Sequence, residues 1–357
     1  MSGVRKRKLP EGSFTAQVTA LDHEGRGVAR IDGKVTFIAD ALPGETVEFK
    51  YLSQRRDKDE GQVTAVLVAS PDRVTPPCAH FGVCGGCALQ HLAPAKQIEW
   101  KQHELMQTLQ RIGKVTPREV APALMGNDLG YRRRATLAAF AKEHGFEILL
   151  QPGGLDSIVP LTGERWPLHY SPDGSEAQLH FLPADFIQVN GPLSQAMVRQ
   201  SMDWLAPQPG DRVLELFAGL GNFTVPLAKT GADVTAVEGD KGLVARGDAN
   251  CRANGVGGVQ WHVADLFKPD PQAPYLQAQF DLALIDPPRA GAIEIMPLLI
   301  AKKPKRILYV SCHPATLARD AALLVEGGYV LTKAGAMDMF PHTSHVESMA
   351  LFERKAK

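Results

Sequence analysis

From about residue 211 onward, short β-rich runs alternate with longer stretches that suit helices. The β-rich runs are RVLEL, VTAVE, VQWHV, FDLALID, RILYVS and YVLTKAGAM. Segments such as KGLVARGDANCRANG and PATLARDAALLVEGG lie between them. Alternation of this kind is typical of a parallel, doubly wound sheet with helices on both faces. The C-terminal part of the chain is therefore predicted to be an α/β domain.

A different pattern occupies residues 13–68, where short alternating apolar runs are separated by turn residues such as Asp32-Gly33. About five strands at this spacing predict a small β-barrel. Prolines, a cysteine cluster and a helix-like stretch from Pro94 to about Ile112 follow, then strand-like segments at 131–140 and 146–152. The predicted parts are a basic tail (1–12), the barrel (13–70), a small central α+β domain (71–185) and the α/β domain (186–357).

Composition excludes several classes of protein. No apolar run approaches the ~18 residues of a membrane-spanning helix, and the basic segment MSGVRKRKLPEG lacks the apolar core of a secretory signal. Lysine plus arginine and aspartate plus glutamate each number 39, so a polyanionic partner must be held by local patches. Five cysteines, three of them within residues 78–87, favour metal or catalytic use over disulfides. We expect a cytoplasmic protein.

The segment RVLELFAGLGNFTVPLA predicts a strand, a tight turn and a helix. Gly219 and Gly221 permit a sharp turn and close approach of a ligand, but Thr224 occupies the place of the third glycine of a dinucleotide fingerprint. Glu238 ends the next strand, where a carboxylate can accept hydrogen bonds from ribose hydroxyls. Asp265 follows the third strand, within reach of an adenine amino group. Together these features predict an S-adenosylmethionine pocket.

Two further strand ends carry reactive groups. Asp286 ends the fourth strand, where open α/β sheets bind ligands. Cys312 ends the fifth strand, before a helix whose N-terminal amides are expected to lower the thiol pKa; the alternative is a small buried apolar residue. A thiolate that adds to C6 of uracil makes C5 nucleophilic towards a methyl donor.

A base must then remove the C5 proton before the thiolate can leave. Glu347, in the segment HTSHVES, is the predicted base, and His342 and His345 are the next candidates. The alternative for Glu347 is a solvated carboxylate on an edge strand. Apolar residues flank the segment and favour an inward-facing position.

Several motifs match one family. LFAGLGNFTVPLA, DPPRAG, YVSCHPATLARD and DMFPHTSHVESMALFER, with DFIQVN upstream, closely resemble the bacterial 23S rRNA (uracil-5-)-methyltransferases over about residues 180–354. Residues 13–68 resemble a TRAM domain, an OB-like RNA-binding barrel. The resemblance implies a Rossmann-like class I methyltransferase domain at the C-terminus. It also implies S-adenosylmethionine contacts at Gln188, Phe217, Asn222, Glu238, Asp265 and Asp286. By the same resemblance Cys312 is the nucleophile, Glu347 the general base, and Phe186 stacks near the flipped uracil.

Cys78, Cys84 and Cys87 are spaced closely enough for three thiolates on one metal centre, for which zinc is the default. The family resemblance implies instead a [4Fe–4S] cluster, which takes four thiolates, the fourth from the central domain. No cysteine lies between Cys87 and Cys251, and the chain passes from YRRRATLAAF to ILLQPGG sooner than this family would suggest. The central domain is therefore predicted to be shortened, leaving an outside or solvent ligand to complete the metal site.

Basic clusters at Arg55, Arg56 and Lys58, at 131–134 and at 302–306 favour phosphate contacts, although any one such cluster is usually a solvated face. The expected partner of a monomeric enzyme is a single-stranded or loop region of 23S rRNA, from which the target base is flipped. One alternative is a transfer-RNA uridine-C5 methyltransferase, an enzyme type that typically lacks both barrel and cysteine cluster. Another is a catalytically impaired RNA-binding protein, which the intact Cys312, Glu347 and Asp286 disfavour.

Overall fold

The computed structural model describes residues 9–132, 149–150, 159–160 and 168–355. Most of the predicted strand-like segments at 131–140 and 146–152 lies outside these residues. Contacts divide the chain into two compact units: Met1–Glu104 with Phe340–His345, and Leu105–Met339 with Val346–Lys357. The domain boundaries expected at 70 and 185 stay predictions. Among the described residues, no helix is long and apolar enough to span a membrane.

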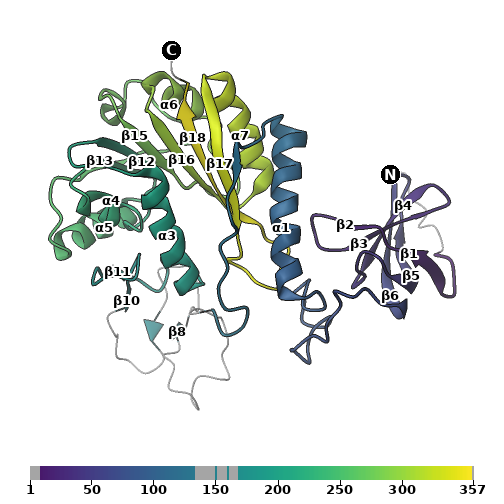
Figure 1. Ribbon diagram of the computed structural model, residues 1–357. Helices are drawn as coiled ribbons and strands as arrows, with labels where there is room; N and C mark the ends of the chain where they lie inside the picture. Colours follow the sequence, from purple (N-terminus) through teal and green to yellow (C-terminus); the bar gives the residue numbers. More distant parts are fainter. Residues whose placement is uncertain (1–8, 133–148, 151–158, 161–167, 356–357) are drawn as a thin grey trace, which may run out of the picture. The chain divides into compact units, whose positions relative to one another are not determined.

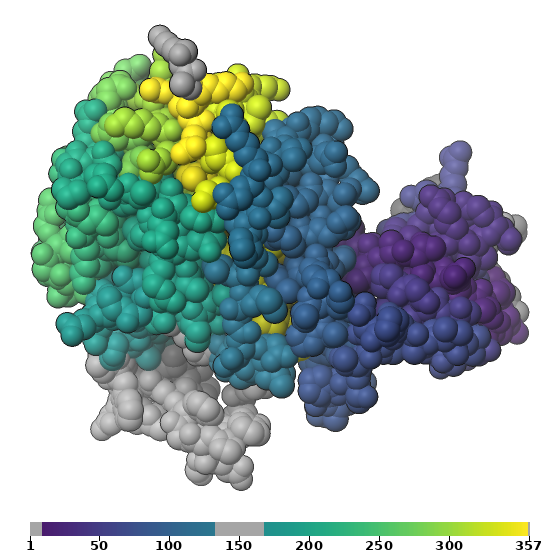
Figure 2. Space-filling view, in the orientation of Figure 1, coloured from purple at the N-terminus to yellow at the C-terminus, as the bar shows by residue number. Residues whose placement is uncertain are grey.

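The first unit contains a six-stranded sheet of order β1-β5-β6-β4-β3-β2, drawn in purple in Figure 1. Its strands are β1 (Phe14–Gln17), β2 (Ala20–Leu21), β3 (Gly27–Ile31), β4 (Lys34–Ala39), β5 (Thr46–Gln54) and β6 (Lys58–Val68). Strands β4 and β6 are parallel, and the other neighbours are antiparallel. The sheet thus has one strand more than the five expected, the additional one being the two-residue β2. Figure 2 shows the purple residues packed into one continuous body.

Alternation along these strands builds the interior of the sheet. Ala29, Ile38, Val47 and Phe49 are fully buried and belong to one apolar cluster. Asp32-Gly33 forms the two-residue turn between β3 and β4 with φ of 50° and 80°, the positive values that a type I′ hairpin turn requires. The predicted turn at this dipeptide is confirmed.

The helix predicted from Pro94 is also confirmed. It consists of α1 (Pro94–Thr108), which continues into the π-helical turn η1 (Leu109–Gly113). Lys114, with φ of 53°, ends it in the left-handed conformation. Within the first unit, the buried Lys101 of α1 donates a hydrogen bond to the carbonyl of Phe340, so the late segment Phe340–His345 belongs to this unit.

The second unit is built on an eight-stranded sheet of order β14-β13-β12-β15-β16-β18-β17-β7. Its strands are β12 (Arg212–Leu216), β13 (Asp233–Glu238), β14 (Gln260–Val263), β15 (Leu282–Ile285), β16 (Arg306–Ser311), β17 (Tyr329–Met337), β18 (Glu347–Arg354) and β7 (Glu119–Val120). The first five in spatial order pair in parallel. The predicted parallel sheet is confirmed for these five strands, and the structure adds β18, which inserts antiparallel between β16 and β17.

Four helices contact this sheet: α3 (Gly191–Leu205), α4 (Thr224–Lys229), α5 (Lys241–Ala253) and α7 (Pro314–Glu326). A fifth helix, α6 (Met296–Lys302), packs against α7. The short elements are β8 (Leu149–Leu150), β9 (Val159–Pro160), β10 (Leu168–Tyr170), β11 (Leu179–Phe181) and the 3₁₀ turn η3 (Pro274–Leu276). The α/β architecture predicted for this region is confirmed, and several of the predicted site residues, among them Glu238 and Asp286, lie where the parallel strands end.

Candidate active site

The glycine-rich turn follows β12 and leads into α4. Phe217, Gly219 and Gly221 all have positive φ, at 63°, 58° and 103°. The amide of Gly221 closes the turn by donating to the carbonyl of Ala218 at 3.1 Å. At φ of 103° a residue with a Cβ is strained, so the tight turn depends on glycine at 221.

Glu238, at the end of β13, lies beside this turn. One carboxylate oxygen accepts the amide of Gly219 at 3.0 Å, and the other accepts the amides of Gly239 and Asp240 at 2.7 and 3.0 Å. The carboxylate is therefore fixed in orientation by two loops at neighbouring strand ends. A half-buried carboxylate held in this way can accept hydrogen bonds from a diol.

Asp265 is exposed just beyond β14, where its carboxylate accepts the amide of Phe267 at 2.9 Å. The ring of Phe267 lies 5.9 Å from the ring of Phe217. Two aromatic rings near a carboxylate suit a flat heterocycle that carries an amino group. Sequence reasoning missed Phe267. The feature that could have indicated it is an aromatic residue two positions after Asp265.

The loop DFIQVN (residues 185–190), between β11 and α3, is held in place by two of its own side chains. Asp185 is buried, accepts the amide of Leu182 at 2.7 Å and pairs with Arg246 of α5. Ile187 packs into an apolar cluster beneath the loop. With Asp185 and Ile187 turned inward, Phe186 between them is 74% exposed and its ring is accessible for stacking.

Two other predicted cofactor contacts lie close to this loop and the glycine turn. Gln188 is half-buried in the loop itself. Asn222 accepts a hydrogen bond from the hydroxyl of Tyr170 at 3.2 Å, so β10 helps to orient it. Tyr170 orients Asn222, and the pair of Asp185 and Arg246 holds the loop. Sequence reasoning assigned no role to Tyr170 or Arg246, and Asp185 entered it only as the first residue of the motif DFIQVN.

Cys312 and Glu347 come together through strand pairing. In the antiparallel register of β16 and β18, Ser311 pairs with Ser348. Cys312 directly follows Ser311, and Glu347 directly precedes Ser348, so both residues lie at the same end of this pair. The edge-strand alternative for Glu347 is wrong, because β18 lies between β16 and β17 and the residue is only 7% exposed.

The pKa of Cys312 contradicts the expectation of a stabilised thiolate. Burial raises the thiol pKa to about 11, the negative charges of Glu347 and Asp286 raise it further, and the cation of Arg289 opposes them. The two carboxylates and desolvation outweigh the amides at the start of α7. The thiol is therefore protonated at neutral pH and must lose its proton when it reacts.

Two carboxyl groups near the parallel strand ends are also perturbed. Burial raises the pKa of Asp286 to about 7. Glu215, one residue before the end of β12, is fully buried, and burial together with the charges of Asp286 and Glu238 raises its pKa to about 8. Sequence reasoning missed Glu215, whose signal is an acid within an otherwise apolar buried strand.

His342 and His345 belong to the first unit. His342 is buried with φ of 66°, and its backbone amide and ring Nδ1 lie 2.9 and 3.1 Å from the side-chain amide of Gln97. Its carbonyl accepts the amides of Ala88 and Leu89, which follow the cysteine cluster. Gln97 therefore holds His342 in place, whereas His345 is exposed.

The cysteine cluster lies on a turn-rich loop. Cys78 and Cys84 are exposed and Cys87 is half-buried. Gln90 joins two of them, since its carbonyl accepts the amide of Cys78 and its amide donates to the sulfur of Cys87, both at 3.2 Å. Within the described parts of the chain, no three histidine, cysteine or acidic side chains are grouped as a metal ion requires.

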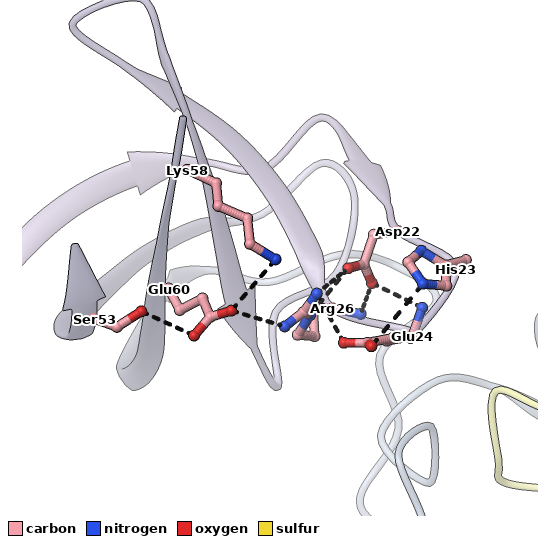
Figure 3. A network of polar contacts seen from close by, with 7 residues as sticks. All are labelled: Asp22, His23, Glu24, Arg26, Ser53, Lys58 and Glu60. Atoms are coloured by element: carbon pink, nitrogen blue, oxygen red, sulfur yellow. Dashed lines mark hydrogen bonds and ion pairs between the residues drawn. The ribbon is translucent and has the colours of Figure 1, made fainter. Parts of the chain in front are cut away.

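The surface of the barrel carries a polar network that neutralises part of its basic patch. Figure 3 shows Arg26 between Asp22 and Glu60, with Ser53 on the far side of Glu60. Lys58 pairs with the same Glu60 oxygen as Arg26. Arg26 and Lys58 also lie over the ring of Phe37, at 4.8 and 5.5 Å from its centre. The ammonium group of Lys58 is thus already paired with groups of the barrel itself.

Arg55 and Arg56 differ from Lys58 because both are exposed. They stand at the turn between β5 and β6, where the amide of Arg55 donates to the carbonyl of Lys58 at 2.9 Å. Of the predicted basic patches, residues 133–134 lie outside the described part of the chain. Arg55 and Arg56 are therefore better suited to phosphate contacts than Lys58.

Comparison with protein families gives two matches. A model described as tRNA (Uracil-5-)-methyltransferase matches residues 172–264 and 275–355. A TRAM domain model matches residues 13–50, within the six-stranded sheet. The first match contains both predicted catalytic residues and every predicted cofactor contact except Asp265, which directly follows its first stretch.

Full-length relatives agree with these matches. The chain is 42% identical to the 23S rRNA (uracil(1939)-C(5))-methyltransferase RlmD of Xanthomonas euvesicatoria, with 98% of this chain and 99% of the relative covered. It is 40% identical to the protein of the same name from Stenotrophomonas maltophilia, with the same coverage. These alignments extend over 440 residues, against 357 in this chain, so the relatives contain residues that the chain lacks.

One solved structure shares the fold over nearly the whole chain. It is the tRNA (uracil-54, C5)-methyltransferase of Pyrococcus abyssi, solved in complex with S-adenosyl-L-homocysteine. The TM-score is 0.67, with 21% identity, covering 95% of this chain and 100% of the other. The combination of barrel and α/β unit therefore has a known structural precedent.

Proposed function

Because the chain belongs to the family of RNA (uracil-5-)-methyltransferases and matches 23S rRNA enzymes over 98% of its length, we propose that it methylates C5 of a uridine in 23S rRNA. The methyl donor is S-adenosylmethionine. The names of the relatives indicate uridine 1939 as the first position to test. The proposed site of action is the cytoplasm, and the proposed working form is a monomer.

The donor would be held by residues at successive strand ends. Glu238 would bind the ribose hydroxyls and Asp265 the adenine amino group, beside the rings of Phe217 and Phe267. Gln188, Asn222 and Asp286 would contact the rest of the molecule. The donor supplies an electrophilic methyl group; the chain's own side chains supply every other element of the reaction.

Cys312 acts on the uracil ring, which Phe186 would receive by stacking after the base leaves its RNA helix. The thiol loses its proton to water, its sulfur bonds to C6, and the C5–C6 π electrons become an enolate. C5 then takes the methyl group as the bond between the methyl carbon and the donor's sulfonium sulfur breaks, and the sulfur keeps the electron pair of that bond. Glu347 removes the C5 proton, and the electrons of that C–H bond restore the double bond and expel the thiolate.

One observation carries this mechanism. The pairing of Ser311 with Ser348 means that the chain neighbours of the pair are a thiol and a buried carboxyl group. The raised pKa of Cys312, to which Glu347 and Asp286 both contribute, supports their proximity. A nucleophile, a base and a group at the donor site are what uracil-C5 methylation requires.

The test is to map 5-methyluridine in 23S rRNA and in tRNA from cells that lack this protein. We expect loss of one 23S rRNA methyl group, restored by the intact protein and not by Cys312→Ala. Loss from tRNA alone would replace the rRNA proposal with the tRNA alternative. Unchanged RNA of both kinds would remove the proposal altogether.

The RNA substrate is expected to bind as a single-stranded or loop segment, because its target base must be unstacked. The match of residues 13–50 to a TRAM domain supports a role for the barrel in holding it. Arg55 and Arg56 are proposed to contact phosphates there.

The metal site fits a four-thiolate cluster poorly. Of the five cysteines, Cys251 is 2% exposed on α5 and Cys312 is assigned to catalysis, which leaves three. We propose that Cys78, Cys84 and Cys87 bind iron and sulfide with low occupancy, completed by an outside ligand. Elemental analysis of anaerobically purified protein tests this, and stoichiometric zinc without iron would assign a structural zinc site instead.

A further inference from the structure

Asp320, on α7, joins three segments of the active-site unit although it reaches no predicted ligand. Its side chain is fully buried. One carboxylate oxygen accepts the hydroxyl of Tyr309 at 2.7 Å and the backbone amide of Ala292 at 2.8 Å. The other accepts the side chain of Arg319 at 2.8 Å.

These three partners have distinct positions in the fold. Tyr309 lies on β16, three residues before Cys312. Ala292 lies in the loop that starts at Asp286, directly after β15. Asp320 therefore ties the strand of the nucleophile to the loop of the predicted donor site.

Arg319 adds a second connection to the same loop. Its guanidinium donates to the carbonyl of Ala290 at 3.0 Å. Between the two attachment points, Gly291 has φ of 79°, and a Cβ there would lie 2.6 Å from Arg319 and 2.8 Å from Asp320. The loop is thus packed directly onto two adjacent side chains of α7, with no space between them for even a methyl group.

We propose that Asp320 is a positioning residue for methyl transfer: it fixes the loop 286–292 against β16 and thereby sets the separation of donor and nucleophile. The donor methyl group and the attacking carbon must meet in a narrow geometry, and a misplacement of about 1 Å can cost about 100-fold in rate. The two strand ends that carry Asp286 and Cys312 are neighbours in the sheet, but backbone pairing of β15 with β16 ends at Ile285 and Tyr309. Asp320 adds a side-chain connection there, because it binds both Tyr309 at the end of that pairing and Ala292 in the loop after β15.

Asp320→Asn and Asp320→Ala test the proposal. Asparagine keeps an acceptor for Tyr309 or Ala292, whereas alanine keeps none. We expect the single-turnover rate of methyl transfer to fall about 100-fold in Asp320→Ala and far less in Asp320→Asn. The affinity for S-adenosylhomocysteine should change less than about threefold in Asp320→Asn, because the pocket residues themselves are intact.

A matched pair of tyrosine variants separates positioning from stability. Tyr309→Phe removes a buried hydroxyl that donates to Asp320, and Tyr329→Phe removes a buried hydroxyl that donates to the carbonyl of Pro304, both within this unit. The two should lower the unfolding midpoint to a similar extent. Only Tyr309→Phe should lower the single-turnover rate, by about tenfold, and equal rates in the two variants would overturn the proposal.

Amide exchange supplies a readout that does not need turnover. The Ala292 amide should exchange faster in Asp320→Ala than in wild type, and at the wild-type rate in Tyr329→Phe; unchanged exchange in Asp320→Ala would show that no clamp exists. The positioning role rests on the proposed function. Wild-type protein that methylates no uridine would contradict that function, whereas active wild type with fully active Asp320→Ala would contradict the positioning role alone.

Discussion

Ser311 of β16 and Ser348 of β18 are paired in antiparallel register, although 37 positions separate them in the chain. The residue after the first is Cys312 and the residue before the second is Glu347. Thiol and carboxyl group therefore share one end of a strand pair in the middle of the sheet. The proposed roles of Cys312 as nucleophile and Glu347 as base can be tested by replacing each residue separately.

Cys312→Ala and Glu347→Gln are expected to stop the reaction at different steps. Without its thiol the protein should bind RNA but form no adduct and transfer no methyl group, because C5 is never activated. Glu347→Gln should add, methylate and then stall, leaving protein bonded to methylated RNA. A denaturing gel with radiolabelled methyl donor distinguishes these states, since only the stalled complex carries label at the position of a protein–RNA adduct.

Normal turnover by Glu347→Gln would mean that another group removes the C5 proton. Activity in Cys312→Ala would end the covalent mechanism. Both variants should retain the affinity of wild type for S-adenosylhomocysteine, which serves as the control for folding.

Adduct formation should accelerate with pH. The pKa of Cys312 is raised to about 11 by burial and by the charges of Glu347 and Asp286, so the thiol is protonated at pH 7 and the thiolate fraction grows roughly tenfold per pH unit below that pKa. The rate of covalent capture of RNA that contains 5-fluorouridine, measured from about pH 6 to 9, reports this fraction.

Glu347→Gln provides the matched comparison in the same assay. Removing a nearby negative charge lowers the pKa of Cys312, so the variant should form the adduct faster than wild type at the same pH. A pH-independent rate in wild type would mean that the thiol is already ionised when RNA is bound. Slower capture by Glu347→Gln would mean that this carboxylate accepts the thiol proton.

Gly221→Val should abolish binding of S-adenosylhomocysteine. The backbone φ of 103° at this residue excludes a β-branched side chain, so the turn after β12 must change shape. Gly210→Val is the control, because Gly210 also has positive φ, at 83°, but lies at the turn before β12 with open space around it. Calorimetric titration decides between them, and unchanged affinity in Gly221→Val would remove this turn from the donor pocket.

Arg55→Ala with Arg56→Ala should weaken RNA binding and reduce its salt dependence. Each lost phosphate contact lowers the slope of log affinity against log salt by about one. Lys58→Ala should have a smaller effect, because Lys58 is already paired with Glu60 and lies over Phe37. Filter binding at several salt concentrations measures both slopes; a larger effect from Lys58 would contradict the assignment.

Gln97→Ala should destabilise the first unit. Its side-chain amide donates to the carbonyls of Leu89 and Leu92 and contacts His342 twice, all in buried surroundings. Leaving such groups without a hydrogen-bond partner costs about 1–3 kcal/mol each. The midpoint of urea unfolding should therefore move to a clearly lower urea concentration. Glu99→Ala, on the exposed face of the same helix, removes only a surface ion pair and should shift little. Similar midpoints for the two variants would contradict the role of Gln97.

Local sequence patterns determined much of the fold and most of the candidate site. The alternation of apolar runs predicted the α/β unit, and the dipeptide Asp32-Gly33 predicted a hairpin turn, because both depend on residues close together in the chain. Positions at strand ends could likewise be read directly, as with Glu238 and Asp286. Parallel strands bring their ends to one edge of a sheet whatever their order.

Tertiary structure decided what depends on distant neighbours. The insertion of β18 between β16 and β17 turned Glu347 from a candidate edge residue into a buried partner of Cys312. The pKa of Cys312 rose instead of falling, because burial and two carboxylates from other strands outweigh the local helix amides. The ties from Asp320 to Tyr309 and Ala292 also depend on three-dimensional packing. Periodicity records which way a side chain faces, whereas desolvation and charge depend on which other segments pack against it.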